Sequence, residues 1–192
     1  MRAQMKEWEE LVNGLDSKQN ILIENIPSID LYMDQVIQLF EKTFADSKRT
    51  EEEKILTKTM INNYAKGKLF FPVKNKKYTN DHIMLISLIY QLKGALSITE
   101  IKGVLNGLNE KVVSDDFDLE EFYQSYLNLF EKNTEDYKIN LKEKVADAVE
   151  EVDSGEKDGE YLQTVLLIAS LVSMSNLYRR TAEKLVDDLT KG

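Results

Sequence analysis

The chain contains no cysteine, one histidine and only two prolines in 192 residues. The absence of cysteine excludes disulfides, thiolate metal ligands and a cysteine nucleophile. The single histidine, His82, excludes a histidine-rich zinc site and leaves one candidate base for a Ser-His-Asp triad. No set of nucleophile, base and orienting group can be assembled. We therefore expect a protein that is not an enzyme and needs no metal or other cofactor.

Residues that break helices are also scarce, because only eight glycines accompany the two prolines. This composition favours helix over sheet, so we expect a mainly α-helical fold. Residues 1–10 hold Arg2 and Lys6 but no apolar segment, unlike a signal peptide. The most apolar stretch, residues 162–178, is interrupted by six polar side chains, whereas a transmembrane helix needs about 20 predominantly apolar residues. We expect a soluble, cytoplasmic protein with no membrane partner.

Charge is distributed unevenly along the chain. The net charge is −9, yet residues 54–80 contain seven lysines and no aspartate or glutamate. This window carries +7, which leaves −16 for the remaining residues. Such segregation concentrates positive potential on one surface, as nucleic-acid binding requires. The alternative is an ordinary solvated lysine-rich face.

Apolar periodicity and capping residues predict several helices in the first part of the chain. Thr50 and Glu53 form a capping-box pattern that predicts the start of a helix ended by Gly67. Ser97 and Glu100 repeat that pattern further on. The expected elements are helices at 3–14, 29–44, 51–66, 80–92 and 98–105, with Thr79 or Asn80 as the cap of the fourth, and a small lysine-rich hairpin at 73–78.

The second part of the chain is expected to be helical and acidic. Residues 118–151 are predicted to form two segments with a kink near Asn133. Leu119, Phe122, Tyr126 and Phe130 line the first segment, and Tyr137, Leu141, Val145, Ala148 and Val149 line the second. The last helix, about 160–189, is apolar nearly all round in its first half and should be buried centrally or between subunits. We expect an N-terminal helix and linker at 1–27, a DNA-binding domain at 28–107 and a helical dimerisation or effector region at 108–192.

Three segments resemble the winged helix-turn-helix domain of the mercury-resistance-regulator (MerR) family over residues of about 28–105. Ile61–Pro72 (INNYAKGKLFFP) is similar to the end of that family's recognition helix, Leu-Arg-Tyr-Tyr-Glu followed by Gly-Leu-Leu and Pro. Lys74–Ile83 (KNKKYTNDHI) resembles its basic wing, and Ser97–Leu105 (SITEIKGVL) resembles its closing helix. The resemblance implies a mainly α fold, with a winged head, a minimal β-hairpin wing and a helical C-terminal region. We also expect the chain to belong to an uncharacterised bacterial family of unknown function with this kind of domain.

The expected recognition helix has a polar face. Lys58, Asn62 and Lys66 lie at i, i+4 and i+8, opposite the apolar Leu56, Met60 and Tyr64. Lysine neutralises phosphate and asparagine can bond both polar atoms of an adenine edge, so this face suits a major groove. The residues expected to bind double-stranded DNA are Lys54, Lys58, Asn62, Asn63, Lys66, Lys68 and the wing lysines Lys74, Lys76 and Lys77.

We therefore predict a sequence-specific DNA-binding transcriptional regulator that acts as a homodimer. A small-molecule effector, if the acidic C-terminal region binds one, should be neutral, apolar or cationic. The alternative is a helical protein–protein interaction module that keeps the fold without binding DNA. Two features favour that alternative: the net charge is −9, and the acidic Glu51–Glu53 at the expected helix start would repel phosphate.

Overall fold

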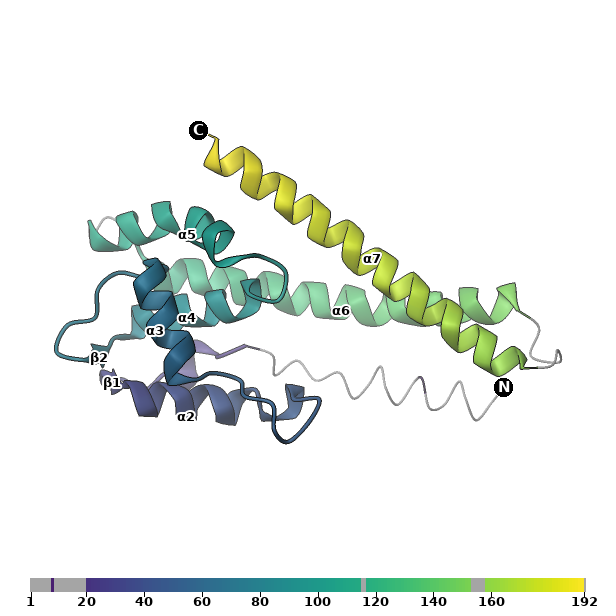
Figure 1. The fold of residues 1–192 in the computed structure, drawn as a ribbon, viewed down its shortest axis with the longest axis horizontal. Helices are drawn as coiled ribbons and strands as arrows, with labels where there is room; N and C mark the ends of the chain where they lie inside the picture. Colours follow the sequence, from purple (N-terminus) through teal and green to yellow (C-terminus); the bar gives the residue numbers. More distant parts are fainter. Residues whose placement is uncertain (1–7, 9–19, 115–116, 153–157, 192) are drawn as a thin grey trace. The chain divides into compact units, whose positions relative to one another are not determined.

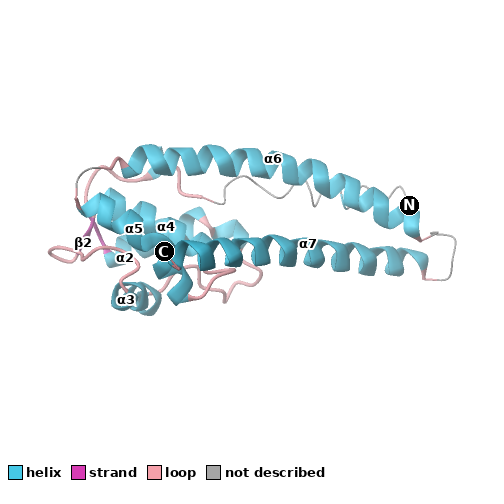
Figure 2. Ribbon diagram, turned by 90° about the horizontal axis from the view of Figure 1, so that it is seen from above, coloured by secondary structure: helices cyan, strands magenta, loops and turns pink. Residues whose placement is uncertain are grey.

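The computed structural model describes residues 8, 20–114, 117–152 and 158–191. It is mainly helical with one two-stranded antiparallel sheet, as the composition predicts (Figures 1 and 2). The elements are η1 (Ile23–Asn25), β1 (Leu31–Tyr32), α2 (Met33–Thr43), η2 (Ala45–Ser47), α3 (Lys58–Gly67), β2 (Lys77–Tyr78), α4 (Asn80–Leu92), α5 (Ile98–Val113), α6 (Leu119–Glu151) and α7 (Gly159–Thr190).

The chain divides into two compact units, which we call the head and the tail. The head comprises residues 18–128 and 183–192, and the tail comprises residues 1–17 and 129–182. Helices α6 and α7 therefore each contribute one segment to both units.

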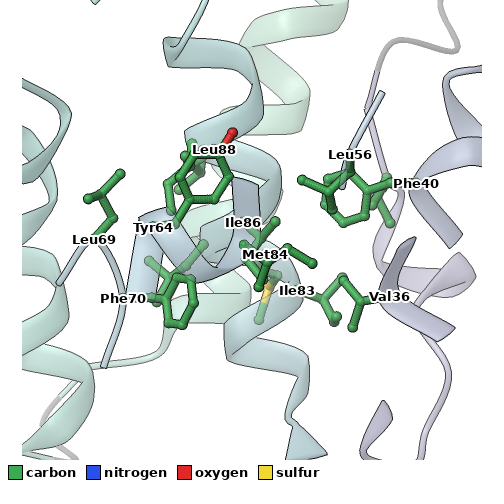
Figure 3. Packing of buried hydrophobic residues seen from close by; sticks show 14 of the residues in the cluster. Val36, Phe40, Leu56, Tyr64, Leu69, Phe70, Ile83, Met84, Ile86 and Leu88 are labelled. Atoms are coloured by element: carbon green, nitrogen blue, oxygen red, sulfur yellow. The ribbon is translucent and has the colours of Figure 1, made fainter. Parts of the chain in front are cut away.

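The core of the head is built around α4. Eight consecutive residues of this helix, His82 to Ile89, are buried, as expected for a helix that is apolar on every side. In Figure 3 the α4 side chains stand between two groups, with Val36, Phe40 and Leu56 on one side and Tyr64 and Phe70 on the other. This packing holds α2 and α3 against a common central helix.

Two helix starts follow the capping patterns in the sequence. Thr79 caps α4, where its backbone N–H donates to His82 Nδ1 over 3.2 Å. His82 Nε2 then donates to the carbonyl oxygen of Phe71 over 3.2 Å, so the ring is neutral. Burial lowers the pKa of His82 below its usual value. Ser97 and Glu100 form the predicted capping box at the start of α5.

The second helix begins later than predicted. Its first residue is Met33 instead of one near Ser28, because Leu31 and Tyr32 pair with Tyr78 and Lys77 as a strand. Ile29 consequently lies outside the helix with 66% of its surface exposed. Sheet pairing with a segment far along the chain outweighs the local helical periodicity here.

The prediction for the third helix was wrong at its start. Helix α3 begins at Lys58, where the Thr57 hydroxyl accepts a bond from the Met60 N–H, so the Thr50–Glu53 pattern caps no helix. The preceding loop is tied to α2 instead: Glu41 accepts a hydrogen bond from the Ile55 N–H over 3.1 Å and pairs with Lys48. These long-range bonds hold the loop in a non-helical path.

Gly67 was predicted to end this helix, but the residue that ends it is the next one, Lys68. Gly67 is still helical, and Lys68 adopts the left-handed conformation that ends α3, with φ 56°. A Cβ at Gly67 would lie 2.6 Å from Cδ1 of Leu69, so a larger residue there would make the Leu69 side chain shift.

The later helices are longer than predicted. Helix α5 continues through Gly107 to Val113, beyond the expected end near Leu105. Helix α6 runs from Leu119 to Glu151 with no break at Asn133, since it contains neither proline nor glycine to interrupt it. Its buried face in the head holds Leu119, Tyr123 and Leu127, whereas Phe122 is 42% exposed.

The tail has a small core. Val145 and Ala148 of α6 pack with Leu167 of α7, and Trp8 and Leu171 lie against them. Trp8 is helical, and the rest of the helix expected at 3–14 lies outside the described residues. The last helix was expected to be buried either centrally or between subunits. Within one chain it is not buried centrally. Most apolar side chains of α7 in the tail are exposed: Tyr161, Leu162, Val165, Leu166, Ile168, Val172, Met174, Leu177 and Tyr178.

One described helix, α7, is long and apolar enough to cross a membrane by length and composition alone. Its most apolar 18-residue window has a mean hydropathy of 1.3, and 11% of that window is buried.

Candidate nucleic-acid interface

Helix α3 presents a polar stripe to solvent. Ile61 and Tyr64 are buried in the head core. Lys58, Asn62 and Lys66 are exposed on the other side, as the spacing of the residues predicts, and Asn63 is exposed beside them. We call Lys58, Asn62 and Lys66 the α3 stripe.

The start of α3 differs electrostatically from the sequence-based expectation. The first turn of the helix contains no acidic residue. The acidic Glu51–Glu53 lie in the loop before it, where Glu53 accepts a hydrogen bond from the Arg49 N–H over 2.8 Å. The positive end of the α3 dipole therefore carries no carboxylate from its own first turn. Lys54 belongs to this loop and not to the helix.

The lysine-rich segment predicted to form a hairpin contains a tight turn closed by one isolated bridge between Lys74 and Lys77, while its strand β2 pairs with β1. The N–H of Lys77 donates to the carbonyl oxygen of Lys74 over 2.9 Å. The two residues between them, Asn75 and Lys76, have φ values of 51° and 57°. Positive φ at both central positions is the signature of a type I′ turn, whose twist matches an antiparallel ribbon. We call residues 74–77 the wing turn.

The wing turn is anchored by pairing between β1 and β2. Leu31 faces Tyr78 and Tyr32 faces Lys77 in antiparallel register. Tyr78 is buried, and the Lys77 ammonium lies 5.9 Å from the centre of the Tyr32 ring. Burial of Tyr78 and this cation–π contact hold the turn against the head.

All seven lysines of the basic window are exposed. Lys58 has an acidic partner, because its Nζ lies 2.8 Å from Oδ1 of Asp34 on α2. Both side chains are about two-thirds exposed, so the pair contributes little stability and can exchange for another anion.

A groove joins the end of α3 to the wing turn. It has a volume of about 1000 Å³. Its walls come from β1, the start of α2, the end of α3, the hairpin and α5. The lining residues are Tyr32, Met33, Asp34, Ala65, Lys68, Phe70, Phe71, Pro72, Val73, Lys76, Tyr78, Asn106 and Asn109.

The groove brings together Lys68 and Lys76, two of the residues expected to bind DNA. Sequence reasoning missed Tyr32, Asp34 and Asn109, which lie far from them along the chain. Asn109 approaches because its Nδ2 donates to the carbonyl oxygen of Leu69 over 3.0 Å. A contact across 40 residues leaves no local pattern in the sequence. Within the described residues, no group of three or more histidines or carboxylates is placed to hold a metal.

The head is therefore a mainly helical domain with a two-stranded sheet and an exposed group of lysines. A sequence model described as "Domain of unknown function (DUF1836)" matches residues 21–126. The chain belongs to that family. The match covers most of the head, including the α3 stripe, the wing turn and the groove. No curated protein and no solved structure matches the chain.

Proposed function

We propose that this protein is a sequence-specific DNA-binding transcriptional regulator. The observation that carries the proposal is the α3 stripe, an exposed helix face without acidic residues in the first turn, next to an exposed lysine-rich turn. The MerR-like resemblance of residues 61–105 supports a winged helix-turn-helix arrangement, in which α3 enters the major groove. The wing turn lies on the neighbouring phosphates.

The stripe and the wing turn have different roles in this proposal. Lys58, Lys66 and the wing lysines neutralise phosphates, which provides affinity without sequence preference. Asn62 is proposed to bond adenine, which would provide preference for one site. The Asp34–Lys58 pair opens when phosphate replaces the carboxylate.

We propose further that the partner of the exposed α7 face is a second copy of the chain. Residues 161–178 contain no charged side chain. Two copies of this segment can therefore pack without charge repulsion, whereas a charged partner would have no opposite charge to pair with there. A groove of about 590 Å³ runs along this face, lined at three- and four-residue spacing from Val165 to Arg180. Such spacing matches the ridges of a second helix. Two α6–α7 pairs then form a four-helix bundle.

A second copy fits this face better than lipid. Gln163, Ser170, Ser173, Ser175 and Asn176 interrupt the apolar residues, and hydroxyl and amide groups are tolerated between packed helices more readily than in a hydrocarbon layer. We propose that the protein is cytoplasmic. Recovery of the native protein in the membrane fraction after cell lysis would contradict this placement.

Salt dependence of DNA binding tests the main proposal. Each lysine on a phosphate releases about one counterion, so removing it should flatten the slope of log affinity against log salt by roughly 1. Lys58→Ala, Lys66→Ala and Lys77→Ala should weaken binding to every sequence. Asn62→Ala should instead cost about 1–3 kcal/mol on the preferred site and leave random DNA nearly unaffected.

A matched control is Lys132→Ala, an exposed lysine in the tail. It should leave the slope unchanged. If the wild type binds no genomic DNA even in about 50 mM salt, or the three lysine variants bind as it does, the basic surface is only solvated. The protein-interaction alternative then replaces the proposed function.

Light scattering tests the dimer. The chain has a mass of 22.2 kDa, so the expected value at micromolar concentration is twice that. Ile168→Glu on α7 should give monomers, whereas Ile29→Glu in the head should remain dimeric. Both isoleucines are strongly exposed within one chain. A wild-type monomer at micromolar concentration would overturn the dimer.

A further inference from the structure

The groove beside α3 is lined by apolar and aromatic side chains that a DNA phosphate would not contact, in addition to its lysines. Phe70 and Tyr78 are buried behind it, and Phe71, Pro72 and Val73 also line it. A phosphate group has no apolar part to cover aromatic side chains. Sites for small organic molecules are mostly apolar concavities with a few placed polar groups, in the range of about 300–1000 Å³.

The charged residues of the groove favour an anion. Lys68 and Lys76 line it, and Asp34 is the acidic residue among the lining side chains. The Asp34 carboxylate is already paired with Lys58 over 2.8 Å. Among the described residues, neither Lys68 nor Lys76 forms an ion pair with a carboxylate.

Both groove lysines occupy strained backbone positions. Lys68 has φ 56° and Lys76 has φ 57°, a left-handed region in which glycine or asparagine would sit with less strain. Strained conformations of this kind gather at binding sites, where side-chain chemistry is kept at a cost in stability. Two lysines at such positions on one groove support a binding role for their ammonium groups.

The groove wall also holds an unmet acceptor. Asn109 Nδ2 donates to the carbonyl oxygens of Leu69 (3.0 Å) and Leu105 (2.9 Å), which fixes the orientation of the amide. Its Oδ1 is buried without a donor among the described residues. The atom is shielded from solvent, so a ligand N–H or O–H reaches it only after the Asn109 side chain shifts toward the groove. Such a shift is favoured because a buried acceptor left unpaired is costly.

We propose that the groove binds a small organic anion with an aromatic body and a hydrogen-bond donor. The carboxylate pairs with Lys68 and Lys76, the ring covers Phe71 and Val73, and the donor bonds Asn109 Oδ1. Because Lys68 and Lys76 are also among the residues expected to bind DNA, the bound anion competes with DNA. Only this competition rests on the proposed function; binding of the anion does not.

Three related probes test the chemistry on the full chain: 4-hydroxyphenylacetate, phenylacetate and 4-hydroxyphenylacetamide. Titrations followed by amide NMR shifts should give a dissociation constant on the order of 1 mM for the first, as expected for about a dozen atoms in an open site. Loss of the hydroxyl or of the carboxylate should each weaken binding by about 3–10-fold. The shifted resonances should belong to residues that line the groove.

Variants assign the contacts to residues. Lys68→Gln and Lys76→Gln should each weaken 4-hydroxyphenylacetate by about 3–10-fold, whereas Lys74→Gln, an exposed wing-turn control outside the groove, should stay within about twofold. Asn109→Ala should bind the hydroxylated and plain acids alike. If Asn109→Ala does not fold, the probe pair on the wild type still decides whether a donor matters.

Several results would overturn the site. These are equal binding of the acid and the amide, equal loss in Lys74→Gln, or shifts confined to α7. The competition is tested by adding 4-hydroxyphenylacetate to a wild-type complex with DNA, which should release the DNA. If the probe binds the groove but the chain binds no DNA, the regulator proposal fails and the site stands. If DNA binds and the probe does not, the site fails alone.

Discussion

The head and the tail are both helical but differ in how much apolar surface they bury. Among the described residues, 25 buried side chains form the core cluster of the head, and three form that of the tail. The head surrounds one apolar helix, α4, with elements from many parts of the chain. In the tail, α7 is comparably apolar, yet Ile168 and Val172 remain 57% and 54% exposed.

This difference supports the proposal that association with a second copy completes the core of the tail. Two packed helices can bury only the seam between them, because each helix has one inward face. An apolar helix with two or three exposed faces needs further helices to cover it. The sequence of α7 fits a subunit interface better than a solvated surface.

The largest expected effect comes from a core truncation in the head. Phe40 is fully buried and its ring lies 5.7 Å from Phe44 and 6.1 Å from Tyr90. Phe40→Ala should lower the free energy of unfolding in urea by about 3–5 kcal/mol. The tail counterpart Ile168→Ala should cost under about 1 kcal/mol at concentrations where the chain is monomeric. Equal losses of unfolding free energy in Phe40→Ala and Ile168→Ala would contradict the inference that the head is better packed than the tail.

A smaller effect is expected where α6 joins the head core. The Tyr123 hydroxyl donates to the carbonyl oxygen of Ile21 over 2.8 Å and lies 2.9 Å from Ser87 Oγ. Burial raises the pKa of Tyr123 to about 12, so it stays a donor. Tyr123→Phe should cost about 1–3 kcal/mol in urea unfolding because it leaves a buried acceptor unpaired. Tyr137→Phe, in the tail on the same helix and 44% exposed, should change stability by less than about 0.5 kcal/mol.

Acid should weaken the head through His82, whose pKa is lowered by burial. The unfolded chain takes up the proton as pH falls through about 6.5, while the folded chain stays neutral. The stability is therefore complete above pH 6.5 and decreases below it, by up to about 1.4 kcal/mol per pH unit, until the folded pKa is reached. Urea unfolding between pH 7 and pH 5 should show this slope in the wild type and lose it in His82→Gln. An unchanged slope in the variant would assign the effect to other groups.

The smallest expected effect is a gain. Lys76→Gly should relieve the left-handed backbone of the wing turn and raise stability by roughly 1 kcal/mol. Asp158→Gly is the tail counterpart, with φ 66°, and should gain less because aspartate tolerates this region. Thermal unfolding measures both. Lys76→Gly should also flatten the salt slope of DNA binding by roughly 1, so a variant that is more stable but binds DNA normally would show that the lysine has no role there.

Much of the head follows from local patterns in the sequence. Capping residues such as Ser97, and the apolar run of α4, are recognised from side chains within one or two turns. The α3 stripe was also placed correctly, because Lys58, Asn62 and Lys66 keep helical spacing wherever the helix begins. The start of α3 was misplaced because Thr50 and Glu53 form a valid local cap that loses to the long-range bonds of Glu41. The DNA-binding role remains a prediction.

The sequence by itself determined the helical class, the segregation of positive charge into residues 54–80 and the apolar character of α7. These properties depend on residue type and on spacing within a few turns. Only the tertiary structure decided that Leu31–Tyr32 is a strand, that Lys68 and Lys76 share one groove and that Asn109 lies in its wall. Those outcomes depend on contacts between segments tens of residues apart, whose free energy exceeds local propensity and leaves no periodic trace in the chain.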